Sequence, residues 1–150
     1  MATKNSSGFK GACAVTGCGG FIGSVLSAYL EDAGWNVVRL SRTNPSPENN
    51  SESYVPFHLG DTLASNLMNN VDVLIHCAYD FSQYRWADVK KVNIDGTEKL
   101  FRSAIKSGVR KICYLSSLSA FPVGVSIYGS AKLECESITS KYGGISVRAG

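Results

Sequence analysis

The chain has 150 residues, about the length of one domain, and its 15 Lys and Arg against 12 Asp and Glu give a net charge of +3. Hydrophobic residues make up 44% and charged residues 18%, as in ordinary globular proteins, and no basic cluster indicates a nucleic-acid partner. No uncharged apolar stretch approaches the roughly 20 residues that span a bilayer, so we expect no membrane partner.

The first half of the chain begins with an apolar strand. Residues 12–16 form a short apolar run bounded by glycine, which is typical of a buried strand. A helix ending at Gly34 is expected next, with an apolar face at helical spacing made of Ile22, Val25, Leu26, Tyr29, Leu30 and Ala33. A second strand is predicted over residues 37–40, and residues 44–53, rich in Pro, Asn and Ser, predict an exposed loop.

The third predicted strand, residues 54–59, contains Pro56. Proline has no N–H to donate, so this strand is expected at an edge of the sheet. Strands and helices then alternate: a strand over 71–78, a helix over 86–107, a strand over 111–116, a helix over 128–142 and a strand over 145–148. This alternation predicts an α/β fold of the Rossmann type, a doubly wound parallel sheet with strand order 3-2-1-4-5-6 and helices on both faces.

A glycine-rich turn joins the first strand to the first helix. In the sequence TGCGGFIG, residues 16–23, the three glycines Gly17, Gly20 and Gly23 are spaced three apart. Glycine permits a tight turn and the approach of a pyrophosphate to the N–H groups at the helix start. The spacing therefore predicts a dinucleotide-binding loop, and the alternative is a glycine-rich turn without a ligand.

Cysteine and histidine usage argues against metal and disulfide chemistry. The five cysteines form no Cys-x-x-Cys pair, and the two histidines, His58 and His76, each lie in a strand-like run. The leading residues are polar and lack the apolar core of a signal peptide. We expect reduced thiols, no metal site and a cytoplasmic protein.

The glycine motif resembles the signature of the extended short-chain dehydrogenase/reductase family, which includes NAD-dependent epimerases and dehydratases. Gly60-Asp61 resembles the pair whose carboxylate contacts the adenine amino group. The segment 76–78, His-Cys-Ala, resembles the stretch beside the cofactor and assigns Ala78 to it, and VNIDGT, residues 92–97, resembles a helix motif of the family. The resemblance also assigns Phe21 and Ile22 to the cofactor loop.

A phenol and an ammonium lie four residues apart at the start of the last predicted helix. Tyr128 and Lys132 therefore share one helix face. A nearby lysine cation stabilises a phenolate, whose tyrosine parent has a reference pKa near 10, and so favours acid–base chemistry. The alternative is an exposed tyrosine beside a solvated lysine. The resemblance implies that Tyr128 is the general acid–base and that Lys132 also reaches the ribose of the cofactor.

The resemblance places the catalytic hydroxyl at Ser117, where it would orient the substrate carbonyl. For Asn93 two interpretations stay open, a water relay beside the cofactor or a bond to a kinked helix backbone. Ten residues separate Ser117 from Tyr128, without the longer acidic and Pro-rich insertion of the sugar-nucleotide epimerases. We therefore expect a small carbonyl, alcohol or sugar-type substrate without assigning a nucleotide sugar.

The end of the second strand predicts the cofactor. An NAD-selective site places a carboxylate there, and none occurs between Ala33 and Pro47. Ser41 and Arg42 are suited to a 2′-phosphate, so NADP is the expected preference and NAD the alternative.

The whole chain, 1–150, is accordingly interpreted as an NAD(P)-binding domain that transfers hydride at an alcohol or carbonyl carbon. The alternative function is a non-catalytic dinucleotide-binding module or redox sensor. The last residues resemble the strand that leads into the substrate region of the family, so a C-terminal substrate domain is expected to be absent. We expect cofactor binding, poor turnover by this chain alone and a tendency to form homo-oligomers.

Overall fold

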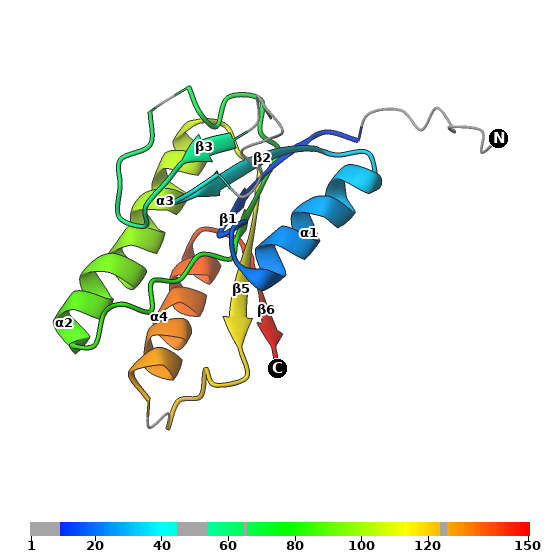
Figure 1. Ribbon diagram of the computed structural model, residues 1–150. Coiled ribbons are helices and arrows are strands. Elements are labelled where there is room, and N and C mark those ends of the chain that lie inside the picture. Colours follow the sequence, from blue (N-terminus) through cyan, green and yellow to red (C-terminus); the bar gives the residue numbers. More distant parts are fainter. Residues whose placement is uncertain (1–9, 45–53, 65, 124–125) are drawn as a thin grey trace.

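The computed structural model describes residues 10–44, 54–64, 66–123 and 126–150, and most of the predicted loop over 44–53 lies outside them. Six parallel strands form one sheet in the order β3-β2-β1-β4-β5-β6 (Figure 1). The strands are β1 (Ala12–Thr16), β2 (Asn36–Ser41), β3 (Tyr54–Pro56), β4 (Val73–His76), β5 (Lys111–Ser117) and β6 (Ile145–Ala149). The predicted Rossmann-type fold and strand order are confirmed.

Two of the strands are shorter than predicted. β3 does lie at the edge, where Pro56 pairs with Ser41 of β2, but it ends at Pro56. β4 ends at His76, two residues before the predicted end. The residues that follow both strands leave the sheet at its carboxyl edge, which is where ligands bind in folds of this type.

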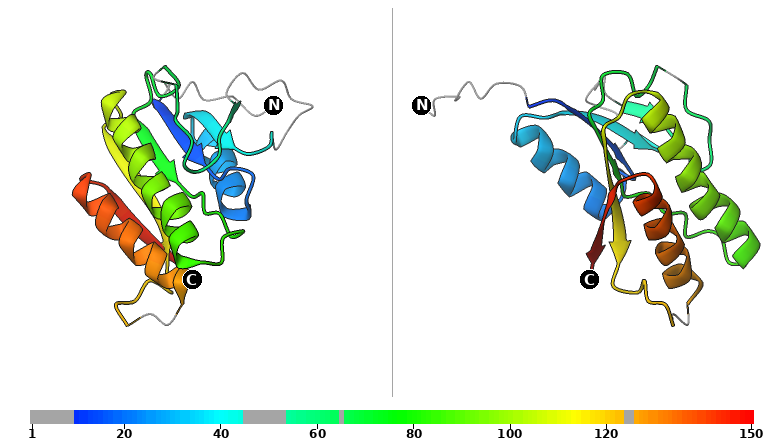
Figure 2. Two further views of the ribbon diagram at one scale, coloured as in Figure 1. Left: turned by 90° about the vertical axis from the view of Figure 1, so that its left-hand side faces the viewer. Right: turned by 180° about the vertical axis from the view of Figure 1, so that it is seen from behind.

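The helices cover the two faces of the sheet unequally. They are α1 (Phe21–Asp32), α2 (Trp86–Val89), α3 (Asp95–Lys106) and α4 (Ile127–Lys141), with a π-helical segment η1 (Lys90–Ile94) between α2 and α3. Figure 2 shows α1 on one face and α3 and α4 together on the other. The larger core cluster, which includes Leu74, Phe101 and Tyr114, lies between the sheet and the α3–α4 layer. None of the described helices is long and apolar enough to cross a membrane.

The apolar face predicted for α1 is confirmed only in part: Leu26, Leu30 and Ala33 are half-buried, and Leu30 packs against the smaller core cluster. Val25 and Tyr29 are exposed, and the buried residues of the helix are Gly23 and Ser27. Small residues bring α1 close to the sheet, and the Ser27 hydroxyl donates to the Gly23 carbonyl at 2.7 Å. The fully buried positions of α1 are therefore small residues, and Ile22, Val25 and Tyr29 turn outward.

The predicted continuous helix over 86–107 is interrupted by the π-helical turn η1. A π-turn inserts one extra residue and redirects the side chains it carries, and such turns occur often at functional sites. Here it turns Asn93 away from its own helix and toward the loop after β4. The π-helical segment has only five residues, too few to change the apolar periodicity of the sequence visibly, so the sequence pattern predicted one helix.

All five cysteines are free thiols, and Cys13, Cys18 and Cys135 are buried. Burial raises the pKa of Cys13 and Cys77 to about 11, which keeps both protonated. The described residues contain no group of three or more His, Cys, Asp or Glu side chains placed to hold a metal ion.

Candidate functional site

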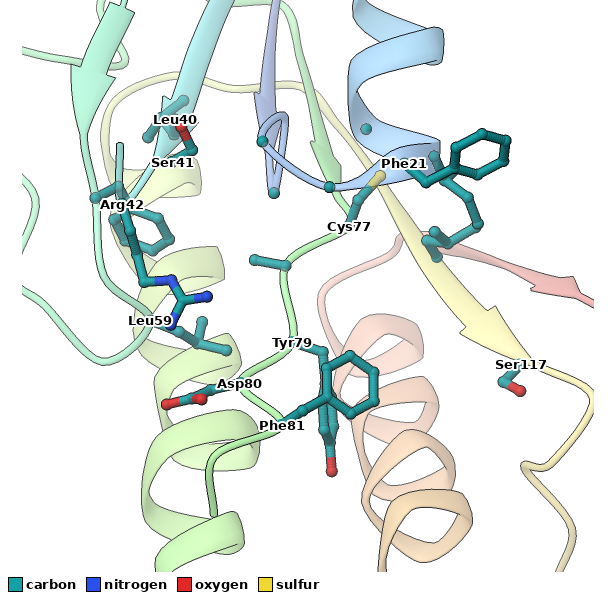
Figure 3. Close-up of a pocket in the computed structure, with 18 of the residues that line it drawn as sticks. Phe21, Leu40, Ser41, Arg42, Leu59, Cys77, Tyr79, Asp80, Phe81 and Ser117 are labelled. Carbon is teal, nitrogen blue, oxygen red and sulfur yellow. The ribbon is translucent and has the colours of Figure 1, made fainter. Parts of the chain in front are cut away.

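A cavity of about 820 Å³ opens at the carboxyl ends of the parallel strands, between the loop after β1 and the start of α4 (Figure 3). Every strand contributes its last residues or the loop that follows it. The cavity gathers most of the residues selected from the sequence: Gly17, Gly20, Phe21, Ile22, Gly23, Ser41, Arg42, Ala78, Ser117, Tyr128 and Lys132.

The glycine loop forms one wall of this cavity and requires glycine at two positions. Gly17 has a φ of +71°, and a Cβ there would lie 2.8 Å from the backbone nitrogen of Ala78. A Cβ at Gly23 would lie 2.3 Å from the carbonyl oxygen of Gly17. Gly20 is the N-cap of α1 and supplies no capping side chain. The first N–H groups of the helix therefore border the cavity without a side-chain cap, which suits an anionic ligand.

Replacing Gly23 with alanine is expected to lower the free energy of unfolding by about 1–3 kcal/mol, because the new methyl group must displace the Gly17 backbone. The measurement is urea denaturation followed by circular dichroism. Gly19→Ala is the matched control, since its Cβ would meet nothing closer than the Cβ of Ser41, at 3.7 Å. Equal stabilities for the two variants would contradict this account of the loop.

The end of β2 presents one arginine to the cavity and holds another away from it. Arg39 forms a two-pronged ion pair with Glu31 of α1. Arg42 lines the cavity, and Figure 3 shows it near Asp80. Hydrogen bonds from Ser82 lower the pKa of Asp80 most, and the charge of Arg42 lowers it further. The Ser41 hydroxyl donates to the Thr43 carbonyl at 2.6 Å.

Tyr128 lies in a cluster of aromatic rings at the start of α4. The Phe81 ring stacks on it at 5.6 Å between centroids with an interplanar angle of 24°, and the Tyr79 ring meets it edge-on at 4.9 Å. The helix begins at this point because the Ser126 hydroxyl caps it by accepting from the Gly129 N–H at 3.0 Å. The phenol is thereby presented to the cavity from a fixed helix start.

Lys132 is buried one turn further along α4. Its ammonium donates to the Leu115 carbonyl at 2.8 Å and lies 5.8 Å from the centre of the Tyr128 ring and 4.8 Å from that of Tyr114. Burial lowers the pKa of Lys132 to about 8. A buried cation thus lies beside the phenol ring, held by the end of β5.

The strand end that carries Ser117 is tied to α4 and β6. Ser117 lines the cavity, and its hydroxyl accepts from the Ser119 N–H at 3.1 Å. The neighbouring Ser116 hydroxyl donates to Glu136 at 2.6 Å, and Arg148 of β6 forms a bidentate pair with the same carboxylate. The Arg148 guanidinium lowers the pKa of Glu136 and keeps it ionised. These bonds fix the last residues of β5 relative to α4, the helix that carries Tyr128.

A chain of buried hydrogen bonds that the sequence did not predict lies behind the cavity. His76 Nδ1 bonds the Thr16 hydroxyl at 2.6 Å, and His76 Nε2 bonds the Thr97 hydroxyl at 2.9 Å. The Thr16 hydroxyl also accepts from the N–H groups of Cys77 and Ala78. These hydrogen bonds connect the end of β1, which leads into the glycine loop, with the end of β4 and with α3.

Two residues selected from the sequence do not line the cavity. The Asp61 carboxylate accepts from the His58 N–H at 3.0 Å and is exposed, whereas His58 and Leu59 themselves line the cavity. Asn93 is buried, and its amide bonds both the N–H and the carbonyl of Asp80. Of the two interpretations left open for Asn93, the bond to a kinked helix backbone is not seen, because the side chain clamps the loop after β4 instead, and the water relay stays a prediction.

Aromatic residues of that loop were missed by the sequence analysis. Tyr79 and Phe81 line the cavity beside Tyr128, and Phe57 lines it on the side of β3. Their position in the sequence could have identified them, because Phe57 directly follows β3 and the other two lie in the loop that follows β4, at the carboxyl edge of the sheet.

Comparison with known proteins identifies relatives of this arrangement. The family model described as "NAD dependent epimerase/dehydratase family" matches residues 13–144. A curated relative, the NAD-dependent glucose-6-phosphate dehydrogenase of Haloferax volcanii, is 31% identical over 109 residues, which are 69% of this chain and 42% of that protein.

Solved structures agree with this match. The UDP-N-acetylglucosamine 4-epimerase of Bacillus cereus has a TM-score of 0.76 and 25% identity, over 92% of this chain and 55% of that one. A short-chain dehydrogenase/reductase superfamily protein of Agrobacterium tumefaciens with bound NAD has a TM-score of 0.80 and 22% identity, over 91% and 48% of the two chains. The chain thus spans about half the length of each of these three proteins.

Proposed function

This chain belongs to the NAD-dependent epimerase/dehydratase family, and from that premise we propose that its cavity binds NAD(P) and promotes hydride transfer at an alcohol or carbonyl carbon. One observation supports the proposal most: the glycine loop, Tyr128 and Lys132 line the same cavity. A bound dinucleotide would extend along this cavity, with its pyrophosphate at the glycine loop and its nicotinamide ring beside the Tyr128 phenol.

The glycine loop fits the cofactor. The close packing of Gly17 and Gly23 leaves the uncapped start of α1 open to a pyrophosphate. Phe57, His58 and Leu59 border the region assigned to the adenine, and Ala78 the middle of the cofactor. In this proposal Asp61 helps to shape the adenine wall by fixing His58, and Asn93 acts by holding the loop that contains Asp80.

When bound, the nicotinamide supplies or accepts the hydride. In the reducing direction the carbonyl carbon accepts the hydride, the Tyr128 hydroxyl gives its proton to the carbonyl oxygen, and an alcohol forms. Ser117 donates to the carbonyl oxygen and orients it, and Lys132 supplies a nearby positive charge that favours the phenolate left behind. Residues 1–150 would thus act as the cofactor-binding domain, and the matched proteins extend well beyond this length.

We further propose that NADP is preferred, with Arg42 as the group that binds the 2′-phosphate. Fluorescence titration of the reduced cofactors is expected to show NADPH binding about tenfold more tightly than NADH or better, because a hydrogen bond to a charged group contributes about 1.5–3 kcal/mol. Arg42→Ala is expected to remove this preference.

Lys106→Ala is the matched control for Arg42→Ala, because it removes one positive charge from an exposed position outside the cavity. It is expected to leave both affinities unchanged. Equal or tighter binding of NADH by the unmodified chain would contradict the NADP assignment and leave NAD as the cofactor. Failure of both cofactors to bind would overturn the proposed function itself.

A further inference from the structure

The part of the cavity around Tyr128 is walled by aromatic and apolar groups. The Phe81 ring, 68% exposed, lies nearly parallel to the Tyr128 ring, and Tyr79 closes the cluster from the edge. Figure 3 shows Phe81 between Asp80 and Ser117. An exposed aromatic ring beside a reactive hydroxyl is a surface on which a planar ligand can stack.

Apolar side chains also follow Ser117 along the chain. The loop that follows Ser117 carries the exposed side chains of Leu118, Phe121 and Val123. Leu118 packs closely on Gly150, which lines the cavity, since a Cβ on Gly150 would lie 2.2 Å from the Leu118 side chain. Leu118 thus adds apolar surface next to the cavity wall, which favours an apolar group of the ligand at this end.

Positive charge is scarce at the same end. Among the described residues that line the cavity, Arg42 and Lys132 are the only Arg or Lys side chains. Arg42 lies on the side of the cavity opposite Ser117 (Figure 3), and the Lys132 ammonium is bound to the Leu115 carbonyl beneath the Tyr128 ring. A diphosphate carries two negative charges and calls for paired cations or several N–H donors. The described side chains that line the cavity around Tyr128 offer no such pair of cations.

We propose that the substrate of this site is an uncharged aryl ketone or aldehyde, whose ring packs on Phe81 while its carbonyl oxygen faces Ser117 and Tyr128. This inference rests on the proposed function and specifies its substrate class. Stacking supplies affinity and holds the carbonyl in plane, and Phe81 acts as the residue that selects for an aromatic group.

The test measures formation of a dead-end complex, so that no turnover is needed. The 150-residue chain is saturated with oxidised cofactor and titrated with acetophenone, with cyclohexyl methyl ketone or with UDP-glucose, and binding is followed by saturation-transfer NMR. Acetophenone is expected to bind, the non-aromatic ketone to bind more weakly, and UDP-glucose to show no binding. Tighter binding of UDP-glucose than of acetophenone would overturn the proposal.

Variants at Phe81 test the stacking surface directly. Phe81→Ala is expected to weaken acetophenone binding about tenfold, because it removes the aromatic pairing and the apolar contact of the ring, and Phe81→Trp is expected to retain binding. Tyr29→Ala is the matched control, because Tyr29 is 69% exposed on α1 and lies outside the cavity. Equal urea midpoints would show that the variants are folded.

The possible results separate the proposed aromatic substrate from the proposed binding of the cofactor. If the cofactor binds and acetophenone does not, or if Phe81→Ala leaves its affinity unchanged, the aromatic substrate is overturned and cofactor binding stands. If the cofactor itself fails to bind, both proposals fall.

Discussion

Replacing Tyr128 with phenylalanine is expected to slow hydride transfer by about 100-fold or more while leaving cofactor affinity nearly unchanged. The change removes one hydroxyl group and keeps the ring, so the contacts of that ring with Tyr79 and Phe81 persist. The proposed proton donor is lost, whereas the glycine loop proposed to bind the pyrophosphate is untouched. Single-turnover absorbance of the reduced nicotinamide, with protein in excess over cofactor and an aryl ketone as substrate, measures the rate even when steady-state turnover is slow.

Lys132→Ala is expected to behave differently, because it should lower both the rate and the affinity. Its ammonium lies beside the Tyr128 ring and bonds the Leu115 carbonyl at the end of β5, so its loss removes a charge and loosens the strand end. Lys141→Ala is the control on the same helix, since Lys141 pairs with Glu98 at the exposed end of α4. A Tyr128→Phe variant with unchanged single-turnover rate would remove Tyr128 from the mechanism.

The parts of the site that the sequence predicted depend on local geometry. Glycine spacing fixes the turn between β1 and α1 within eight residues, and Pro56 excludes β3 from the interior of the sheet. The four-residue spacing of Tyr128 and Lys132 fixes a shared helix face. Such features need only the backbone around them, so a pattern in one segment predicts them.

The parts that the sequence did not predict depend on contacts between segments. Nothing in the spacing of α1 indicates that Gly23 and Ser27 make the closest approach to the sheet, because that depends on the glycine loop beneath them. Asn93 bonds a loop 13 residues away in the chain, and the π-turn that permits this bond has no local signature. The aromatic wall of the cavity likewise forms only when the loop after β4 meets α4.

His76 illustrates a residue whose role depends wholly on such tertiary contacts. Its ring is fully buried, and both nitrogens are bonded to threonine hydroxyls, Thr16 on one side and Thr97 on the other. A neutral imidazole has one donor and one acceptor nitrogen, which the two hydroxyls can satisfy together. Burial first, and the charge of Lys132 second, lower the pKa of His76 to about 3. The ring therefore stays neutral in the folded protein.

This neutrality predicts a loss of stability in mild acid. In the unfolded chain His76 titrates near the ordinary value of 6.5, so between that value and about 3 the unfolded state binds a proton that the folded state does not. Stability therefore falls as pH falls through this window, with a slope that approaches about 1.4 kcal/mol per pH unit. We expect the free energy of unfolding to decrease by about 2 kcal/mol between pH 7 and pH 5, measured by urea denaturation at each pH.

The exposed residue His58 provides the control, because His58→Gln is expected to leave this decrease in place. Carboxylates whose pKa values are lowered in the fold, such as Asp72 and Glu136, add their own losses chiefly below pH 5 and so do not account for the change. NMR titration of the imidazole carbons tests the same point without a variant of His76. If the buried ring titrates near pH 6.5, or if stability is equal at pH 7 and pH 5, then His76 is not held neutral by the fold, and the hydrogen-bond chain from Thr16 to Thr97 does not form as described.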